Sequence, residues 1–207
     1  MCAQPLATTA IVLDRTLTAE HWLRLSLFSA QHGLLDGLQR LSRKSAASTP
    51  ALDLFDEVRV ALESRNQGRT WFVRDVVPVR RRPGLGASYA VLLEACRFAR
   101  VLTRNPLHEE SRVAVYALLG RALDAWEAGA RPDAVYFKTL FLLARDEGYP
   151  VREEWHRQLA TDDRGDVERV LKEPAAEQTT PDQEVARLAR ALEEYLRHTA
   201  TMRFEDL

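Results

Sequence analysis

Hydrophobic and polar residues alternate with a period of two through much of the first 80 residues. Five such runs or short apolar stretches occur, at residues 8–15, 23–27, 34–41, 58–62 and from 71 onward. This alternation is typical of strands that bury one face. Gly33 and Gly68 lie between runs and suit the positive-φ position of a hairpin turn. The segment therefore predicts five short strands, which favours a small closed barrel.

The remainder of the chain places apolar residues three and four apart, which is the period of an amphipathic helix. Helices are expected at residues 87–104, 109–127, 132–148 and 181–199, with one short helix inside the polar segment 161–179. The pattern predicts an α+β protein with a five-stranded barrel in residues 1–80 and an α-helical domain in residues 81–207.

Two local details of these helices follow from their residues. In the helix at 87–104, the predicted buried face consists of Tyr89, Leu92, Leu93, Cys96 and Ala99. Before the last helix, residues 180–183 have the pattern of a capping box. In that arrangement the Thr180 hydroxyl accepts a hydrogen bond from a free amide of the first turn.

Charge divides unevenly along the 207 residues, although the net charge is only −1. Residues 1–86 carry 12 Lys and Arg against 8 Asp and Glu, whereas residues 87–207 carry 17 against 22. The first part is thus net +4 and the second net −5. An excess of this size is compatible with a polyanion partner and equally with an inert surface.

Sequence signatures of catalysis and of metal binding are missing. The chain has no phosphate-binding G-x-x-x-x-G-K loop and no G-x-S-x-G nucleophile turn, and its five histidines are scattered. Cys2 and Cys96 cannot form a disulfide framework or a four-thiolate zinc site. We therefore expect no enzyme, no catalytic residue, no metal and no cofactor. The chain lacks both a membrane-length apolar run and a secretory signal pattern, which predicts a cytoplasmic protein.

Cations gather at three places in the barrel half. A polar loop at residues 45–50 is preceded by Arg40, Arg43 and Lys44. The domain junction contains Arg80, Arg81 and Arg82. A further candidate is Arg24, if it faces outward. Cations at a strand end beside a loop can follow a phosphate backbone, as in small five-stranded barrels that hold single strands. The alternative is a solvated loop with incidental charge.

Single-stranded nucleic acid also needs aromatic surfaces on which bases stack. The barrel half contains five candidates, most of which are expected in the core by default: Trp22, Phe28, Phe55, Trp71 and Phe72. Trp71 and Phe72 are adjacent in a strand, so their side chains point to opposite faces. One of the two must leave the barrel interior, where it stacks on a base or packs on the helical domain.

Several motifs resemble, in order, those of the RecO family of bacterial DNA repair proteins. The "AIVL" strand lies at residues 10–13, the "LF-x-x-x-HG-L" hairpin at 27–34 and the basic segment at 40–45. Residues 141–150 resemble the family's "L-x-x-L-G-Y-x-P" helix end, and residues 191–198 resemble its last helix. The resemblance spans most of the chain.

This resemblance implies an OB-fold barrel followed by a helical domain. It implies a nucleoid-associated recombination mediator that binds single- and double-stranded DNA without sequence preference and anneals complementary strands. The implied partners are the C-terminal tail of single-stranded DNA-binding protein and RecR. Many members carry a four-cysteine zinc module after the "GY-x-P" segment, whereas residues 151–156 contain no cysteine, which indicates a zinc-free member.

The partner tail, which is hydrophobic and ends in a carboxylate, needs an apolar groove with cations at its rim. Phe137, Leu140, Phe141 and Arg145 lie on the first helix to search for this groove. For the three apolar residues, the favoured interpretation is bundle core, with Arg145 solvated. A competing hypothesis is a protein-interaction adaptor with weak or lost DNA affinity. The modest charge excess and the Leu41-Ser42 pair, where the family usually has Gly-Ala, favour that alternative.

Overall fold

The computed structural model describes residues 4–19, 21–41, 52–64, 68 and 70–204. The chain divides into two compact units, Met1–Arg82 and Pro83–Leu207. The sequence places the boundary two residues earlier. Each unit is described by itself below.

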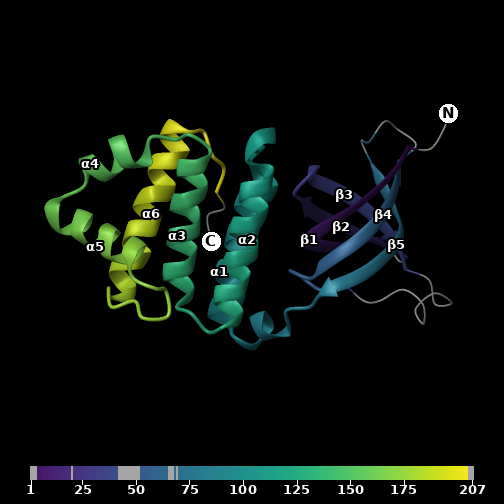
Figure 1. Cartoon of the computed structure of the whole chain (residues 1–207), viewed down its shortest axis with the longest axis horizontal. Coiled ribbons are helices and arrows are strands. Elements are labelled where there is room, and N and C mark those ends of the chain that lie inside the picture. The colour runs from purple at the N-terminus through teal and green to yellow at the C-terminus, as the bar shows by residue number, and fades with distance from the viewer. Residues whose placement is uncertain (1–3, 20, 42–51, 65–67, 69, 205–207) are drawn as a thin grey trace. The chain divides into compact units, whose positions relative to one another are not determined.

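The first unit is a closed five-stranded barrel (Figure 1). Its strands are β1 (Gln4–Ala19), β2 (Trp22–Ser29), β3 (Gly33–Arg40), β4 (Glu57–Ser64) and β5 (Trp71–Arg80). The order around the barrel is β1-β2-β3-β5-β4, and all pairs are antiparallel except β3 with β5. This is the predicted OB-fold, and its closure leaves no strand edge unpaired along the ring.

The interior of the barrel is filled by the residues that the period-two pattern places on one face. In β2, Leu25 and Leu27 are fully buried, whereas Arg24, the residue before Leu25, is exposed. The central cluster consists of Ala10, Val12, Leu25, Leu27, Leu35, Leu52, Val58, Val60, Leu62, Trp71 and Val76. Branched and aromatic side chains dominate, as they do in other small barrels.

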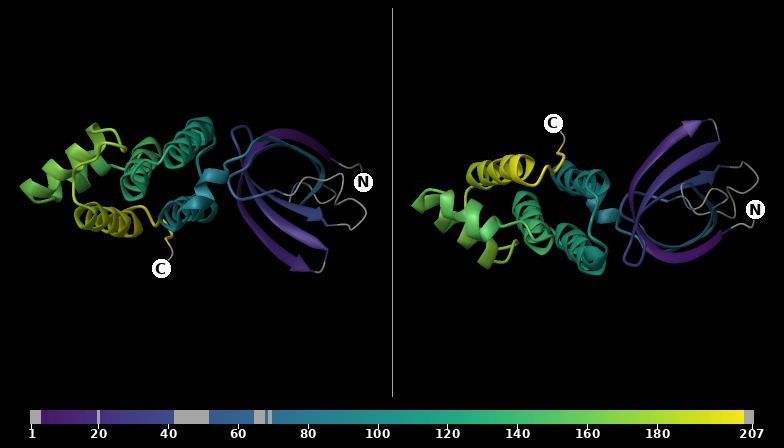
Figure 2. Two further views of the ribbon diagram at one scale, coloured as in Figure 1. Left: turned by 90° about the horizontal axis from the view of Figure 1, so that it is seen from below. Right: turned by 90° about the horizontal axis from the view of Figure 1, so that it is seen from above.

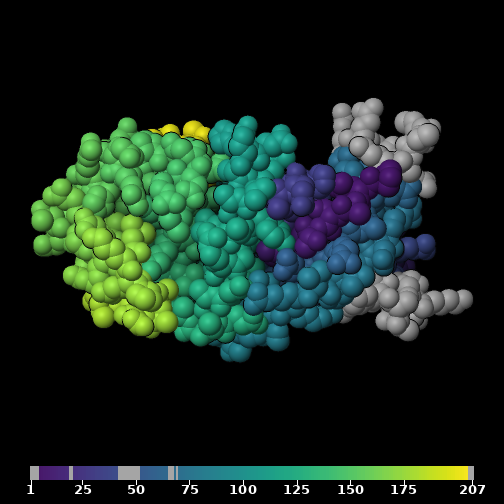
Figure 3. All heavy atoms as spheres, viewed as in Figure 1, coloured from purple at the N-terminus to yellow at the C-terminus, as the bar shows by residue number. Residues whose placement is uncertain are grey.

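β1 is longer than the apolar run at residues 8–15 predicts, because its polar second half also pairs. It has 16 residues and borders both β2 and β4. Two register irregularities against β2, at Val12/Asp14 and Leu17/Ala19, bend it as it crosses from one neighbour to the other. The space-filling view shows β1 beside β4 on the barrel surface, with side chains closing the seam (Figure 3). The turn glycines are confirmed, since Gly33 and Gly68 have φ of 66° and 81°.

The second unit is helical and is built around α3. Its elements are η1 (Pro83–Ala87), α1 (Tyr89–Arg104), η2 (Glu109–Ser111), α2 (Arg112–Glu127), α3 (Pro132–Asp146), the π-helical turn η3 (Val151–Trp155), α4 (His156–Gln158), α5 (Thr161–Lys172) and α6 (Asp182–Thr199). The end-on views show α3 between α2 and α6 (Figure 2), and it contacts α1, α2, α5 and α6. Accordingly α3 is buried almost all round. None of the helices in the described part of the chain is both long and apolar enough to cross a membrane.

The predicted buried face of α1 is wrong. Tyr89 is 80% exposed, and the helix instead buries Val91, Ala95, Phe98 and Leu102. Of the predicted residues only Ala99 is buried. The first turns of α1 are apolar on several sides, so spacing alone does not select the stripe that faces α3.

The predicted capping box before α6 is also wrong. The helix begins at Asp182 with Pro181 as its N-cap, one residue later than a Thr180 cap requires. The Thr180 hydroxyl is buried and has no hydrogen-bond partner among the described residues. Its carbonyl oxygen accepts a hydrogen bond of 2.5 Å from Arg131, which holds the segment against the start of α3.

Candidate nucleic-acid interface

The outward surface of β2, β3 and β5 brings aromatic and cationic side chains together. Strand register pairs Trp22 with Arg40, Arg24 with Leu38, and Leu38 with Phe72. Paired residues in a sheet project to the same side. Because Leu25 and Trp71 point into the core, these five residues point outward. We call the surface formed by Trp22, Arg24, Asp36, Leu38, Arg40, Glu63, Phe72 and Arg74 the outer face.

An aromatic pair forms the centre of the outer face. The rings of Trp22 and Phe72 lie edge to face, with centroids 6.0 Å apart and an interplanar angle of 70°. Both side chains are half-buried, so each keeps some ring surface open to solvent. Trp71 is the inward member of the Trp71-Phe72 pair, at 8% exposed. Trp22 is an exception to the expectation that most barrel aromatics lie in the core. It follows the strand alternation, which places it on the face opposite to the inward-pointing Leu23.

Three arginines surround this aromatic pair. Arg24 forms an ion pair with Asp36 at 3.2 Å, and Arg74 forms one with Glu63. Arg40 is exposed and has no ion-pair partner among the residues that the structure describes. Arg74 was not among the sequence candidates, although its position two residues after Phe72 places it on the same face. Arg43 and Lys44 lie outside the described residues and follow β3 directly.

The junction arginines do not join the outer face. Arg80 is at the far end of β5, eight residues or roughly 26 Å from Phe72. Arg81 forms an ion pair of 3.4 Å with Asp56. Arg82 is only 5% exposed, and its guanidinium donates to the Phe55 carbonyl at 3.5 Å. The prediction that Arg82 contacts phosphate is wrong, because a buried guanidinium has no surface to offer.

The predicted partner-binding residues on α3 are bundle core. Phe137, Leu140 and Phe141 are each at most 1% exposed, and the two phenylalanine rings pack on Trp155 with centroids 6.3 and 6.2 Å away. They cannot line an open groove, so the groove prediction is wrong for all three and the bundle-core interpretation is confirmed. Arg145 is exposed and pairs with its neighbour Asp146 at 2.7 Å.

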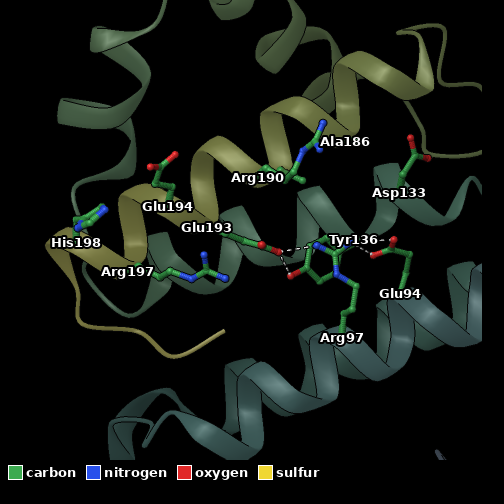
Figure 4. Close-up of a pocket in the computed structure, with 11 residues that line it drawn as sticks. Glu94, Arg97, Asp133, Tyr136, Ala186, Arg190, Glu193, Glu194, Arg197 and His198 are labelled. Atoms are coloured by element: carbon green, nitrogen blue, oxygen red, sulfur yellow. Dashed lines mark hydrogen bonds and ion pairs between the residues drawn. The ribbon is translucent and has the colours of Figure 1, made fainter. Parts of the chain in front are cut away.

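An open cavity does exist in the helical unit, between α1, α3 and α6, with a volume of about 840 Å³ (Figure 4). It is lined by Glu94, Arg97, Asp133, Tyr136, Ala186, Ala189, Arg190, Glu193, Glu194, Arg197 and His198. Small alanines on α6 leave room between the helices. No apolar stripe in the sequence marks this cavity, since its lining is mostly charged.

A charged network forms the floor of this cavity. Arg97 bridges Glu94 at 2.9 Å and Glu193 at 2.8 Å, and the Tyr136 hydroxyl donates to Glu193 at 2.5 Å. The Arg97 guanidinium also lies 4.3 Å from the centroid of the Tyr136 ring. In Figure 4 these side chains converge from α1, α3 and α6. The network therefore ties three helices together at their polar contact.

Burial dominates the electrostatics of this network. It raises the pKa of the Glu94 carboxyl, against the opposing effect of Arg97. It also raises the pKa of the Tyr136 hydroxyl, and the neighbouring Glu193 carboxylate adds to the rise. Tyr136 thus stays a neutral donor to Glu193. Within the described residues, no group of three or more His, Cys, Asp or Glu side chains could hold a metal ion.

Comparison with known proteins adds little to this geometry. Neither a scan against protein-family models nor a search of curated proteins found a match to the chain. Several chains of solved structures match, among them one from a replication protein A heterotrimer bound to ssDNA, with 19% identity and a TM-score of 0.28. The match covers 47% of this chain and 66% of that one, just under two thirds of its length. Because this TM-score is low, we base the assignment of the OB-fold on the strand order of the barrel and not on the similarity.

Proposed function

We propose that this protein is a RecO-like DNA repair and recombination mediator whose outer face binds DNA. The single observation that carries the proposal is the outward Trp22–Phe72 pair beside Arg40, on strands β2, β3 and β5 of an OB-fold. In OB-folds the face of strands 2 and 3, with the loops at its end, is where oligonucleotides bind. The order of the RecO-like motifs along the chain supports the same function.

The chemistry of the outer face favours binding without sequence preference. Every base has a π-face that can stack on Trp22 or Phe72, and every nucleotide has a phosphate that Arg40 can contact. Unpaired strands fit best because their bases can reach the rings, whereas duplex DNA offers only its backbone. Annealing follows if two strands are held on such a surface without readout of their base edges. No covalent bond is made or broken in this proposal.

The proposed partner site moves from the core of α3 to the open cavity between α1, α3 and α6. Arg190, Arg197 and His198 lie along one side of it on α6, and Ala186 and Ala189 form its apolar part. The three cations can receive the terminal carboxylate of the tail, and the two alanines are the apolar surface that its hydrophobic residues would contact. Single-stranded DNA-binding protein is therefore proposed to bind there through its tail. RecR is proposed from the motif resemblance alone.

The proposal is tested by fluorescence anisotropy of labelled oligo-dT, titrated with the full chain at several salt concentrations. We expect micromolar or tighter binding that weakens with salt, and its loss when Trp22 and Phe72 are both replaced by Ala. Tyr89→Ala is the matched control, because Tyr89 is an 80% exposed aromatic in the helical unit. Binding that survives the double replacement would move the DNA site away from the outer face.

One observation favours the adaptor alternative. Two of the three described cations on the outer face, Arg24 and Arg74, are paired with acidic side chains. If the chain fails to bind oligo-dT but still captures single-stranded DNA-binding protein, and loses that capture with Arg190→Ala, the adaptor function is the correct one.

A further inference from the structure

Acidic side chains on the outer face compete directly with any phosphate that approaches it. Asp36 lies across from Ser26 on the neighbouring strand and pairs with Arg24 at 3.2 Å. Glu63 lies across from Phe72 and pairs with Arg74. Each of the two acids thus forms an ion pair with one of the two guanidinium groups on the outer face. Arg40, opposite Trp22, is left without such a partner among the described residues.

We infer that Asp36 and Glu63 set the DNA affinity of the outer face by holding Arg24 and Arg74 in ion pairs that phosphates must displace. This inference rests on the proposed function and concerns the regulation of the same site. In the resting protein, the outer face presents its aromatic pair and one arginine, Arg40, that has no ion-pair partner in the described part of the chain. When single-stranded DNA binds, its phosphates also contact Arg24 and Arg74, and the two ion pairs of these arginines break.

Exposure indicates that these ion pairs can exchange. The Arg24 and Asp36 side chains are 56% and 45% exposed, so their attraction is screened by water and is weak. The Arg74 side chain is 53% exposed, whereas Glu63 is only 22% exposed. Glu63 is therefore held more firmly than Asp36 and is the stronger competitor. Ser26 also donates to Asp36, at 3.4 Å, but this is a long hydrogen bond that adds little restraint.

Salt dependence follows from the same exchange. An unpaired arginine that meets a phosphate releases a condensed counterion, at roughly 0.7 of a unit of log–log slope on single strands. An arginine already paired with a carboxylate gives less, because one ionic contact replaces another. Neutralising both acids should therefore strengthen binding and steepen its salt dependence at the same time.

The test uses Asp36→Asn, Glu63→Gln and the double variant of the full chain, with labelled oligo-dT of about 16 nucleotides, the upper site size of one OB-fold. We expect each single change to tighten binding roughly two- to fivefold, Glu63→Gln the more strongly, and the double variant to steepen the salt slope by about one unit. Asp53→Asn is the matched control. Asp53 forms an ion pair with Arg15 at 3.3 Å. Arg15 is paired in the sheet with Leu25, which points inward, so this ion pair lies on the side of the sheet opposite to the outer face.

The outcomes separate the inference from the proposed function. If Asp36→Asn and Glu63→Gln bind no more tightly than Asp53→Asn while Trp22→Ala weakens binding, the inference is overturned and the DNA site stands. If the wild type binds no DNA but the double variant does, competition by the acids is supported in its strongest form. If neither binds, the inference and the proposed DNA site both fail.

Discussion

The arginines of the outer face and the arginine of the cavity floor are placed in opposite ways. On the barrel, Arg24 and Arg74 are more than half exposed and each meets a single carboxylate on the surface. In the helical unit, Arg97 is only 21% exposed and is shared between two carboxylates and a tyrosine ring. The first arrangement leaves a guanidinium exchangeable, whereas the second makes it part of the structure.

Burial explains this difference. A surface ion pair contributes at most about 1 kcal/mol because water and salt screen it. A buried pair costs much more to break, since the remaining charge is left without a partner. Arginine thus stabilises helix packing in the helical unit, whereas on the barrel it is proposed to bind DNA. The following changes separate the two roles.

The largest effect is expected from Arg97→Ala. It leaves Glu94 and Glu193 facing each other at the floor of the cavity, and we expect the helical unit to lose about 3 kcal/mol of unfolding free energy. Urea unfolding followed by circular dichroism measures this loss. Arg187→Ala, which removes exposed pairs with Asp163 and Glu184, should cost less than about 1 kcal/mol. Equal losses in the two variants would contradict the buried role of Arg97.

Next in size is the effect of Trp22→Ala on DNA binding. Loss of one stacking surface should raise the dissociation constant for oligo-dT about tenfold or more, since stacking is worth roughly 1–3 kcal/mol per base. Anisotropy at fixed salt measures it, together with the unfolding free energy to exclude a collapsed barrel. An unchanged constant in a folded variant would mean that the ring stays in its edge-to-face contact with Phe72 and meets no base.

A smaller effect is expected from Arg40→Ala. Removing the arginine that has no described ion-pair partner should lower the log–log salt slope by roughly 0.7, the value for one phosphate contact on a single strand. Titrations at four or more salt concentrations give the slope. Arg82→Lys serves as the comparison. Because Arg82 is buried away from the outer face, the salt slope of this variant should match that of the wild type.

The smallest effect is a pH dependence in the helical unit. Since burial raises the folded-state pKa of Glu94 above its ordinary value of 4.5, the folded protein holds this proton more tightly than the unfolded chain. Unfolding free energy should therefore fall as the pH rises from about 4.5 through the raised pKa, and level off above it. Glu94→Gln should remove this component of the pH profile. A profile that is unchanged in the variant would assign the dependence to another carboxyl.

The barrel was more predictable than its binding surface. Period-two runs located the strands. They also predicted that either Trp71 or Phe72 points outward, and the structure shows that Phe72 does, because Trp71 lies in the core. Trp22 was not singled out among the five barrel aromatics, and Arg74 was missed, although alternation around Leu23 and Phe72 contains the signal for both. Asp36 and Glu63 could not be assigned, because their pairing with Arg24 and Arg74 depends on which strands are neighbours.

The helical unit shows the limit of periodicity. Spacing located α1 and α3, but it selected the wrong face of α1. The groove at Phe137, Leu140 and Phe141 was inferred from the family resemblance and not from spacing, and these residues lie in the core. A helix packed on several sides, as α3 is, has no polar face to orient it. The cavity above Arg97 and Tyr136 arises from three helices that are distant in sequence.

The sequence by itself determined where the five strands and the long helices lie, the order of barrel before helices, and the candidate cations, because each depends on local spacing and residue type. Only the tertiary structure decided which of those cations share a surface, which are buried and which already have an acidic partner. These properties depend on strand register and helix packing between residues far apart in the chain, and no local pattern encodes them.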